Sequence, residues 1–126
     1  MISSSEVLIA GVTRDQRTYI LDLTGAVRRR ADMLVKGFPG LYHNQADDTV
    51  LAFGGGTVRM LADTEIYSLT CDKWEMLPYK MKYPRASFTP CEYHSVLYLV
   101  GGFTSQIESF SLKTRTFSVM ITATVK

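Results

Sequence analysis

A repeated order of residues begins with Leu51-Ala52-Phe53-Gly54-Gly55, an apolar run that ends in a glycine pair. It continues with Glu65-Ile66-Tyr67-Ser68-Leu69 and then with Trp74. The same order returns as Leu97-Tyr98-Leu99-Val100-Gly101-Gly102, then Glu108-Ser109-Phe110-Ser111-Leu112, then Phe117. The glycine pairs begin 47 residues apart, and the aromatic pairs lie 43 residues apart. The chain therefore contains an internal repeat.

A repeat of roughly 40–50 residues that is built from short strands and glycines is typical of β-propeller blades. Short apolar runs rich in β-branched and aromatic residues predict buried strands rather than helices. One blade cannot bury both of its faces, so blades are stable only beside other blades in a ring. The pattern thus indicates an architecture more clearly than it indicates a ligand.

The predicted strands occupy three equivalent sets of positions. They are 7–10, 49–53 and 96–100, then 19–23, 65–69 and 107–112, then strands that start near Val27, Trp74 and Phe117. All four prolines fall where a strand begins or ends, and they mark connections because proline is excluded from central strands. The stretch Gly25–Lys36 tolerates a helix, but its place in the repeat favours a strand.

Length and composition describe one ordinary globular domain of 126 residues. The hydrophobic share is 46% and the charged share is 21%, so nothing indicates disorder. A net charge of +2 is too small to predict a nucleic-acid partner or a membrane surface. No apolar run reaches the 18 or more residues of a transmembrane helix, and residues 1–6 do not resemble a secretory signal.

The chain has two cysteines, Cys71 and Cys91, which do not suggest a disulfide framework. Reduced thiols are expected, and with them a cytoplasmic location. Each cysteine is interpreted as a small, partly buried residue.

The ordered set of glycines and aromatic residues resembles the kelch repeat. The best match consists of Gly54, Gly55, Tyr67, Trp74, Met81 and Pro84-Arg85. The next unit keeps Gly101 and Gly102, with Phe110 and Phe117 in the aromatic positions. The first unit is degenerate, because it has Ala10-Gly11 for the glycine pair and Leu21 and Val27 for the aromatic residues. The repeated set favours this family over a generic β-sandwich.

The resemblance implies an all-β chain: a partial kelch-type β-propeller of about three four-stranded antiparallel blades. All of residues 1–126 form one kelch-repeat region, with a partial first blade at about 6–36, a second at about 38–82 and a third at about 84–126. The first blade lacks its innermost strand. Propellers of this family commonly close with six or seven blades. The chain is then either a fragment of a longer propeller or a half-propeller that assembles, and two copies would give six blades.

No catalytic motif accompanies this pattern. A P-loop, a dinucleotide-binding glycine motif, Gly-x-Ser-x-Gly and His-Glu-x-x-His are all absent from the sequence. His43 and His94 are the only histidines, and a metal needs three or four converging ligands. Copper-radical oxidases occur among kelch-type propellers, but Cys71 and Cys91 lack the context of their cysteine–tyrosine cross-link. We predict no enzymatic activity, no catalytic, cofactor-binding or metal-binding residue, and no cofactor.

The function that the resemblance implies is non-catalytic protein binding through loops. One face of such a propeller carries the loops between second and third strands together with the connections between blades. The partner-binding residues predicted there are Arg14, Arg17, Arg59, Lys80, Lys82, Tyr83 and Arg85. This set is mostly basic, which suits an acidic peptide loop. Arg85 is equally compatible with a structural role. The structural motif residues are Gly54, Gly55, Tyr67, Trp74, Gly101, Gly102, Phe110 and Phe117.

An alternative function is structural, in a chain that uses its open blade faces to complete a propeller or a larger complex. An unpaired strand edge in the first blade would need a cover. The β-prone tail Thr122–Lys126 is predicted to reach the first blade of a second copy, which would close a homodimer. The run Arg28-Arg29-Arg30 is interpreted as a charged, exposed outer edge strand.

Overall fold

The structure is a computed structural model that describes residues 6–11, 16–34, 37–56 and 59–122. Within these ranges the chain forms strands, turns and connections but no helix, so the prediction of an all-β chain is confirmed there. The strands are β1 (Glu6–Ala10), β2 (Thr18–Asp22), β3 (Val27–Arg30), β4 (Gly40–Asn44), β5 (Thr49–Phe53), β6 (Thr64–Ser68), β7 (Lys73–Met76), β8 (Cys91–Tyr93), β9 (Val96–Leu99), β10 (Gln106–Ser111) and β11 (Phe117–Thr122). The stretch after Gly25 thus contains strand β3, as its place in the repeat predicts.

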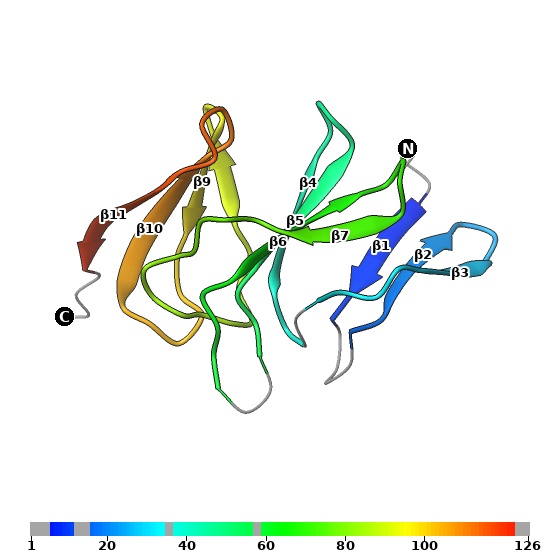
Figure 1. Cartoon of the computed structure of the whole chain (residues 1–126), viewed down its shortest axis with the longest axis horizontal. Coiled ribbons are helices and arrows are strands. Elements are labelled where there is room, and N and C mark those ends of the chain that lie inside the picture. The colour runs from blue at the N-terminus through cyan, green and yellow to red at the C-terminus, as the bar shows by residue number, and fades with distance from the viewer. Residues whose placement is uncertain (1–5, 12–15, 35–36, 57–58, 123–126) are drawn as a thin grey trace.

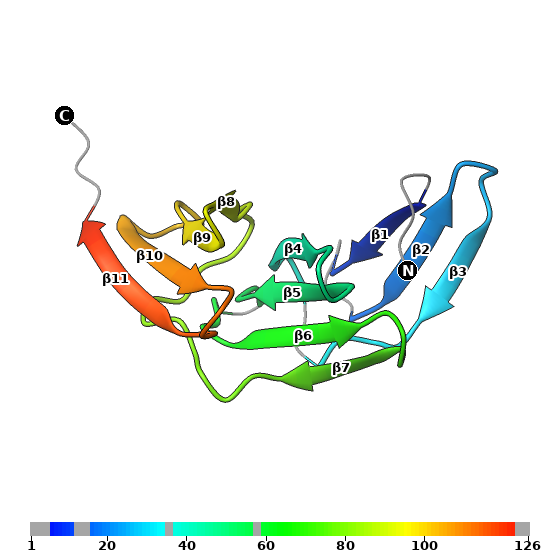
Figure 2. The same ribbon diagram turned by 90° about the horizontal axis from the view of Figure 1, so that it is seen from above.

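The strands form three antiparallel sheets, in each of which a strand pairs with the next one in the sequence (Figure 1). The first sheet is β1-β2-β3, the middle sheet is β4-β5-β6-β7 and the third sheet is β8-β9-β10-β11. Figure 2 shows the sheets side by side in a fan, with β1, β4 and β8 on the inner side and β3, β7 and β11 on the outer side. The middle sheet is therefore flanked by a sheet on each face.

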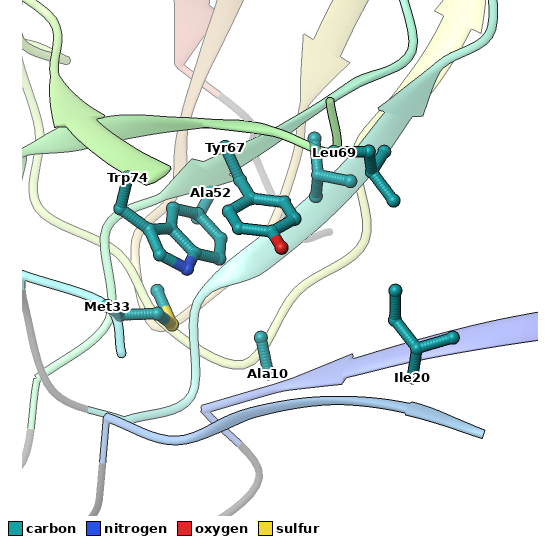
Figure 3. Close-up of a cluster of buried hydrophobic side chains, with 8 residues drawn as sticks. Ala10, Ile20, Met33, Ala52, Tyr67, Leu69 and Trp74 are labelled. Atoms are coloured by element: carbon teal, nitrogen blue, oxygen red, sulfur yellow. The ribbon is translucent and has the colours of Figure 1, made fainter. Parts of the chain in front are cut away.

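The first core lies between the first and middle sheets (Figure 3). It contains eight buried residues: Ala10, Ile20, Met33, Val50, Ala52, Tyr67, Leu69 and Trp74. The rings of Tyr67 and Trp74 pair across β6 and β7 with centroids 5.0 Å apart. The Trp74 indole donates hydrogen bonds to the Thr18 hydroxyl and to the Ala31 carbonyl, each at 3.1 Å. Trp74 thus supplies apolar area and also bonds the middle sheet to the first.

The second core lies between the middle and third sheets. Its buried residues are Leu51, Phe53, Met81, Leu97, Leu99 and Phe110. The Phe53 ring meets Phe110 edge to face at 5.3 Å, and it meets Phe117 at 6.1 Å. Phe110 and Phe117 are paired on β10 and β11 as Tyr67 and Trp74 are paired on β6 and β7. The aromatic pairs of the repeat therefore occupy equivalent positions, each at the face toward the preceding sheet.

Strand β5 is apolar on both faces because it is buried on both. Val50 and Ala52 belong to the first core, whereas Leu51 and Phe53 belong to the second. Alternate residues of a strand point to opposite faces, so this continuous apolar run requires a sheet on each side.

Gly54 ends β5 in the left-handed region, with φ at +66°. A Cβ atom at this position would lie 2.1 Å from the Arg85 carbonyl oxygen, in the connection that leads to the third sheet. Gly55 extends this contact by donating its backbone N–H to the same oxygen at 2.9 Å. The glycine pair is thus required by a close approach of two backbones as well as by backbone conformation.

We expect Trp74→Ala to destabilise the fold by about 3–5 kcal/mol, because it removes a buried aromatic side chain and two hydrogen bonds between sheets. Denaturant unfolding measures the effect. Tyr79→Ala is the matched control, since Tyr79 is exposed and should change stability little. A loss below about 1 kcal/mol for Trp74→Ala would contradict its place in the core.

We expect Gly54→Ala to cost more than Gly101→Ala, although both glycines have positive φ. At Gly101 an added Cβ meets no atom within 4 Å, so only the backbone penalty of about 1–2 kcal/mol applies. At Gly54 the clash with the Arg85 carbonyl adds to that penalty. Thermal or denaturant unfolding of both variants checks the order, and equal losses would show that the close approach does not matter.

Candidate protein-interaction site

The outer face of the first sheet carries an apolar row. The register of β1, β2 and β3 places Val7 beside Leu21 and Leu21 beside Val27. Val7 is 56% exposed and Val27 is 59% exposed. Ile9 lies two residues along β1 from Val7, on the same face. We call Val7, Ile9, Leu21 and Val27 the open face.

The same row is buried in the middle sheet. Val50 pairs with Tyr67 and Tyr67 with Trp74, as Val7 pairs with Leu21 and Leu21 with Val27. Val50, Tyr67 and Trp74 are 0–4% exposed because the first sheet covers them. Leu21 and Val27 thus take the places of the two aromatic residues, as the sequence predicts. The open face has the composition of a surface that is covered elsewhere in this chain.

The outer face of the third sheet is more polar. Its central row is Cys91, Tyr98 and Ser109, and it corresponds to the row Tyr42, Leu51 and Ile66 of the middle sheet. Val100, directly after β9, the strand that corresponds to β5, is 50% exposed. Both end sheets of the fan therefore present a face whose counterpart in the middle sheet is covered by a neighbouring sheet.

The first sheet has an open strand edge at β1. Within the described residues, β1 pairs with β2 on one edge and with no strand on the other. A groove of about 290 Å³ runs beside that second edge, lined by Glu6, Val7, Leu8, Leu41, His43 and Val50. Apolar side chains form most of its wall, and Glu6 and His43 are its ionisable residues.

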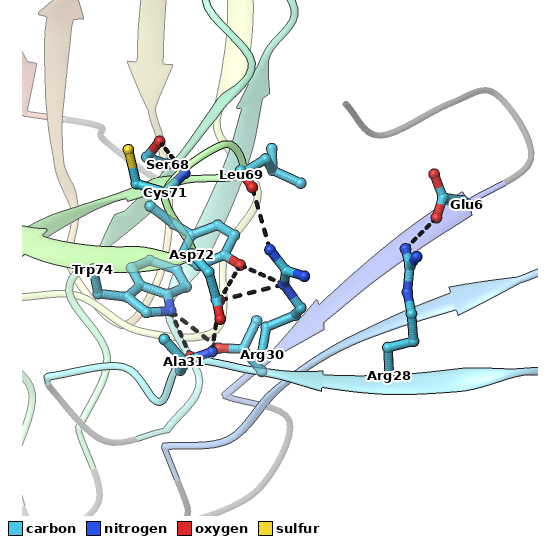
Figure 4. Close-up of polar contacts among 11 residues, drawn as sticks. Glu6, Arg28, Arg30, Ala31, Ser68, Leu69, Cys71, Asp72 and Trp74 are labelled. Carbon is cyan, nitrogen blue, oxygen red and sulfur yellow. Dashed lines mark hydrogen bonds and ion pairs between the residues drawn. The ribbon is translucent and has the colours of Figure 1, made fainter.

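Arg30 bonds the first sheet to the middle sheet (Figure 4). Its guanidinium donates to the Tyr67 hydroxyl at 3.0 Å and to the Leu69 carbonyl at 3.2 Å, and it lies 3.3 Å from the Asp72 carboxylate. The Ala31 N–H, and after it the Tyr67 hydroxyl, hold the pKa of Asp72 below its usual value. The interpretation of residues 28–30 as an exposed edge is therefore correct for two arginines only, because Arg30 is half-buried at an interface.

The other two arginines of that run remain at the surface. Arg28 lies 2.5 Å from Glu6 on β1, and Arg29 lies 3.2 Å from Asp32. Both are exposed, and each has an acidic partner within the first sheet or directly after it. They form no basic patch together with Arg30.

Arg85 has to be removed from the predicted partner-binding set. Its side chain and that of Glu108 are fully buried and form an ion pair at 3.0 Å. The guanidinium also donates to the carbonyls of Leu99, Gly101 and Gln106. A side chain with no exposed surface cannot contact a partner, so Arg85 has the structural role that the sequence left open.

The other predicted basic residues lie in different connections. Arg17 and Arg59 are exposed in the β1–β2 and β5–β6 connections, and Arg14 lies outside the described residues. Lys80 pairs with Asp63 at 2.9 Å, and the Lys82 ammonium lies 5.7 Å from the centre of the Tyr83 ring. The contact between Lys80 and Asp63 brings two connections together, whereas Arg17 lies in a separate connection.

Glu65 and Glu108 are buried structural residues that the sequence analysis did not predict. The Glu108 carboxylate accepts the backbone N–H groups of Lys82 and Tyr83, and Glu65 accepts that of Leu34. Each glutamate thus fixes the connection that enters its sheet. The available signal was their spacing, because Glu65 and Glu108 lie 43 residues apart like the aromatic pairs.

The inner strands form a polar groove of about 430 Å³, lined by Tyr42, His43, Asn44, Gln45, Ala46 and Glu92. Burial, and after it a hydrogen bond with Glu92, raises the pKa of Tyr42 to about 12. His43 lies 3.1 Å from Asp48. The described residues contain no group of three or more His, Cys, Asp or Glu side chains placed to hold a metal ion.

We expect Tyr42 to ionise late in an alkaline titration, and to destabilise the fold as it does so. An unfolded tyrosine loses its proton near pH 10, whereas folded Tyr42 holds it to about 12. The stabilising contribution is therefore complete below pH 10 and is lost as the pH rises toward 12. In a titration followed by phenolate absorbance, the transition at high pH that belongs to Tyr42 should be missing from Tyr42→Phe. It should still be present in Tyr79→Phe. A late transition unchanged in Tyr42→Phe would contradict the assignment.

Comparisons with known proteins leave the family open and show the fold. No family model matches the chain, and no curated protein matches it. The solved structure of YjhT is similar, with a TM-score of 0.77 and 15% sequence identity. The match covers 94% of this chain and 48% of that one, so this chain spans about half the length of YjhT. The described part of this chain contains no helix that could cross a bilayer.

Proposed function

We propose that the chain is a kelch-type β-propeller segment of about three blades that works as a non-catalytic protein-interaction module. The observation that carries this proposal is the open face, where Val7 and Val27 are more than half exposed at positions whose counterparts in the middle sheet are buried. Exposed contiguous apolar surface of this kind marks a site of protein contact. The contacts are therefore made mainly by the faces of the end sheets, and less by the basic loops.

A second copy of the chain is the partner that fits the open face. Within the chain, the residues that correspond to the open face pack against the face of the first sheet that is equivalent in position to the outer face of the third sheet. The third sheet of one copy would cover the first sheet of another, and the reverse contact would close a two-fold ring. Two copies would give six blades. They would also supply the length of YjhT, of which one copy matches 48%.

The loop-binding function stays a prediction. Arg17, Arg59 and Lys82 are exposed, as binding of an acidic peptide requires, and they lie in three different connections. The absence of catalytic activity and the cytoplasmic location likewise stay predictions from the sequence.

We expect the chain to have twice its 14.1 kDa mass in light scattering at micromolar concentration. Val27→Asp should yield the single-chain mass, because it places a charge within the proposed apolar contact. Leu23→Asp is the matched control, since Leu23 is 84% exposed in the β2–β3 turn, away from the open face. A folded wild-type chain of 14.1 kDa, or a Val27→Asp variant that stays associated, would contradict closure by a second copy.

A further inference from the structure

The groove beside the inner edge of β1 is a second surface of the first sheet, and it adjoins the open face at Val7. The middle and third sheets each have four strands, and their innermost strands are β4 and β8. The first sheet has three described strands, and its open edge faces the same inner side of the fan as β4 and β8 (Figure 2). The groove of about 290 Å³ therefore lies where an innermost strand of the first sheet would run.

We propose that this groove binds an extended, tyrosine-bearing segment of a protein partner, which adds to β1 as a fourth strand. The tyrosine ring enters the groove between Leu8, Leu41 and Val50, and its hydroxyl lies beside His43. The proposal rests on the propeller arrangement proposed above. It concerns the inner edge of the first sheet, whereas the open face concerns its outer surface.

The edge of β1 supplies backbone recognition. An edge strand presents N–H and C=O groups in a row, and an extended peptide can pair with them. Residues Glu6–Ala10 are extended and pair regularly with β2, so their other edge is already shaped for a partner strand. Such pairing provides affinity from the main chain, whereas pockets for alternate side chains provide the choice of sequence.

The middle sheet, which carries Tyr42 where the third sheet carries Cys91, indicates an aromatic side chain for the apolar groove. In the middle sheet, Tyr42 of β4 pairs with Leu51, which lies three residues before Gly54. Leu8 lies three residues before Gly11, and φ is +61° at Gly11 and +66° at Gly54. Leu8 packs toward the middle sheet as Leu51 packs toward the third. A residue paired with Leu8 therefore takes the place of Tyr42 and points toward the next sheet.

The repeat also places a hydrogen-bonding partner for that tyrosine. Tyr42 and Glu92 line one groove, where Glu92 contributes to the raised pKa of the Tyr42 hydroxyl, and Glu92 pairs with Leu97 on β9. His43 pairs with Val50 on β5, and Val50 and Leu97 each lie four residues before a glycine pair. His43 thus occupies in the groove the position that Glu92 occupies beside Tyr42. Its Nε2 lies 3.1 Å from Asp48, and Nδ1 is the ring atom left to bond a phenol.

A synthetic peptide with the sequence of residues 38–45 is a suitable probe, because it contains β4, which fills this position in the middle sheet. We expect this peptide to bind the full chain in a fluorescence-anisotropy titration. The same peptide with alanine at its tyrosine should bind at least tenfold more weakly, since a buried aromatic anchor carries much of such an interface. Leu8→Glu should abolish binding while circular dichroism shows that the chain is still folded.

A double-mutant cycle tests the contact with His43. Replacing the peptide's tyrosine by phenylalanine should weaken binding roughly twofold to tenfold on the wild-type chain, the range for one hydrogen bond. The same replacement should change nothing on His43→Leu. Equal losses on both proteins would remove His43 from the site, and that part of the proposal would be overturned.

Hydrogen exchange tests strand addition directly. Bound peptide should slow exchange at alternate amides of β1, because every second N–H of an edge strand points toward the added strand. Binding without this protection, or no binding by the wild-type chain, would overturn the proposal.

The Val27→Asp variant tests this proposal separately from the proposed function. Val27 lies on the outermost strand of the first sheet, at the edge opposite to β1, so its replacement should leave the open edge of β1 unchanged. We expect Val27→Asp to bind the peptide as the wild type does, whatever its own mass. Binding by Val27→Asp alone would mean that a second copy fills the groove in the wild type, and it would overturn the proposal.

Discussion

The rest of the structure depends on the two-sided burial of strand β5. Its side chains alternate between two cores, so the middle sheet needs one sheet over each face. Burial of apolar surface is the main stabilising term in folding, and both hydrophobic cores of this chain lie between sheets. In the fan of Figure 2, the middle sheet is covered on both faces, and each end sheet is covered on one face.

Polar contacts at the two interfaces fix the sheets relative to one another. Arg30 and Trp74 connect the first and middle sheets, and the buried pair of Arg85 and Glu108 holds the connection into the third. Hydrogen bonds to backbone carbonyls satisfy most of the Arg85 guanidinium, which offsets the cost of burying its charge. Burial of the apolar cores stabilises the contact between sheets but does not fix their relative orientation. The hydrogen bonds and the ion pair fix that orientation.

Sequence reasoning found the strands because the apolar runs, glycines and aromatic pairs recur in order. It also found the equivalence of Leu21 and Val27 with Tyr67 and Trp74, which the strand register confirms. It did not foresee that Arg30 is held between sheets or that Arg85 is buried, because a basic residue in a strand or connection has the same local pattern in either case. The groove beside β1 could not be predicted from the sequence either, because a groove depends on how strands that are distant in the sequence pack together.

The pairing of every strand with its neighbour in the sequence has a consequence for folding. Each hairpin closes a short loop, which costs little chain entropy. We therefore expect strand pairing within a sheet to cost less chain entropy than docking of the sheets, which closes longer loops. Evolution by duplication suits such a chain, because a copied segment brings with it the strand pairing of its own sheet.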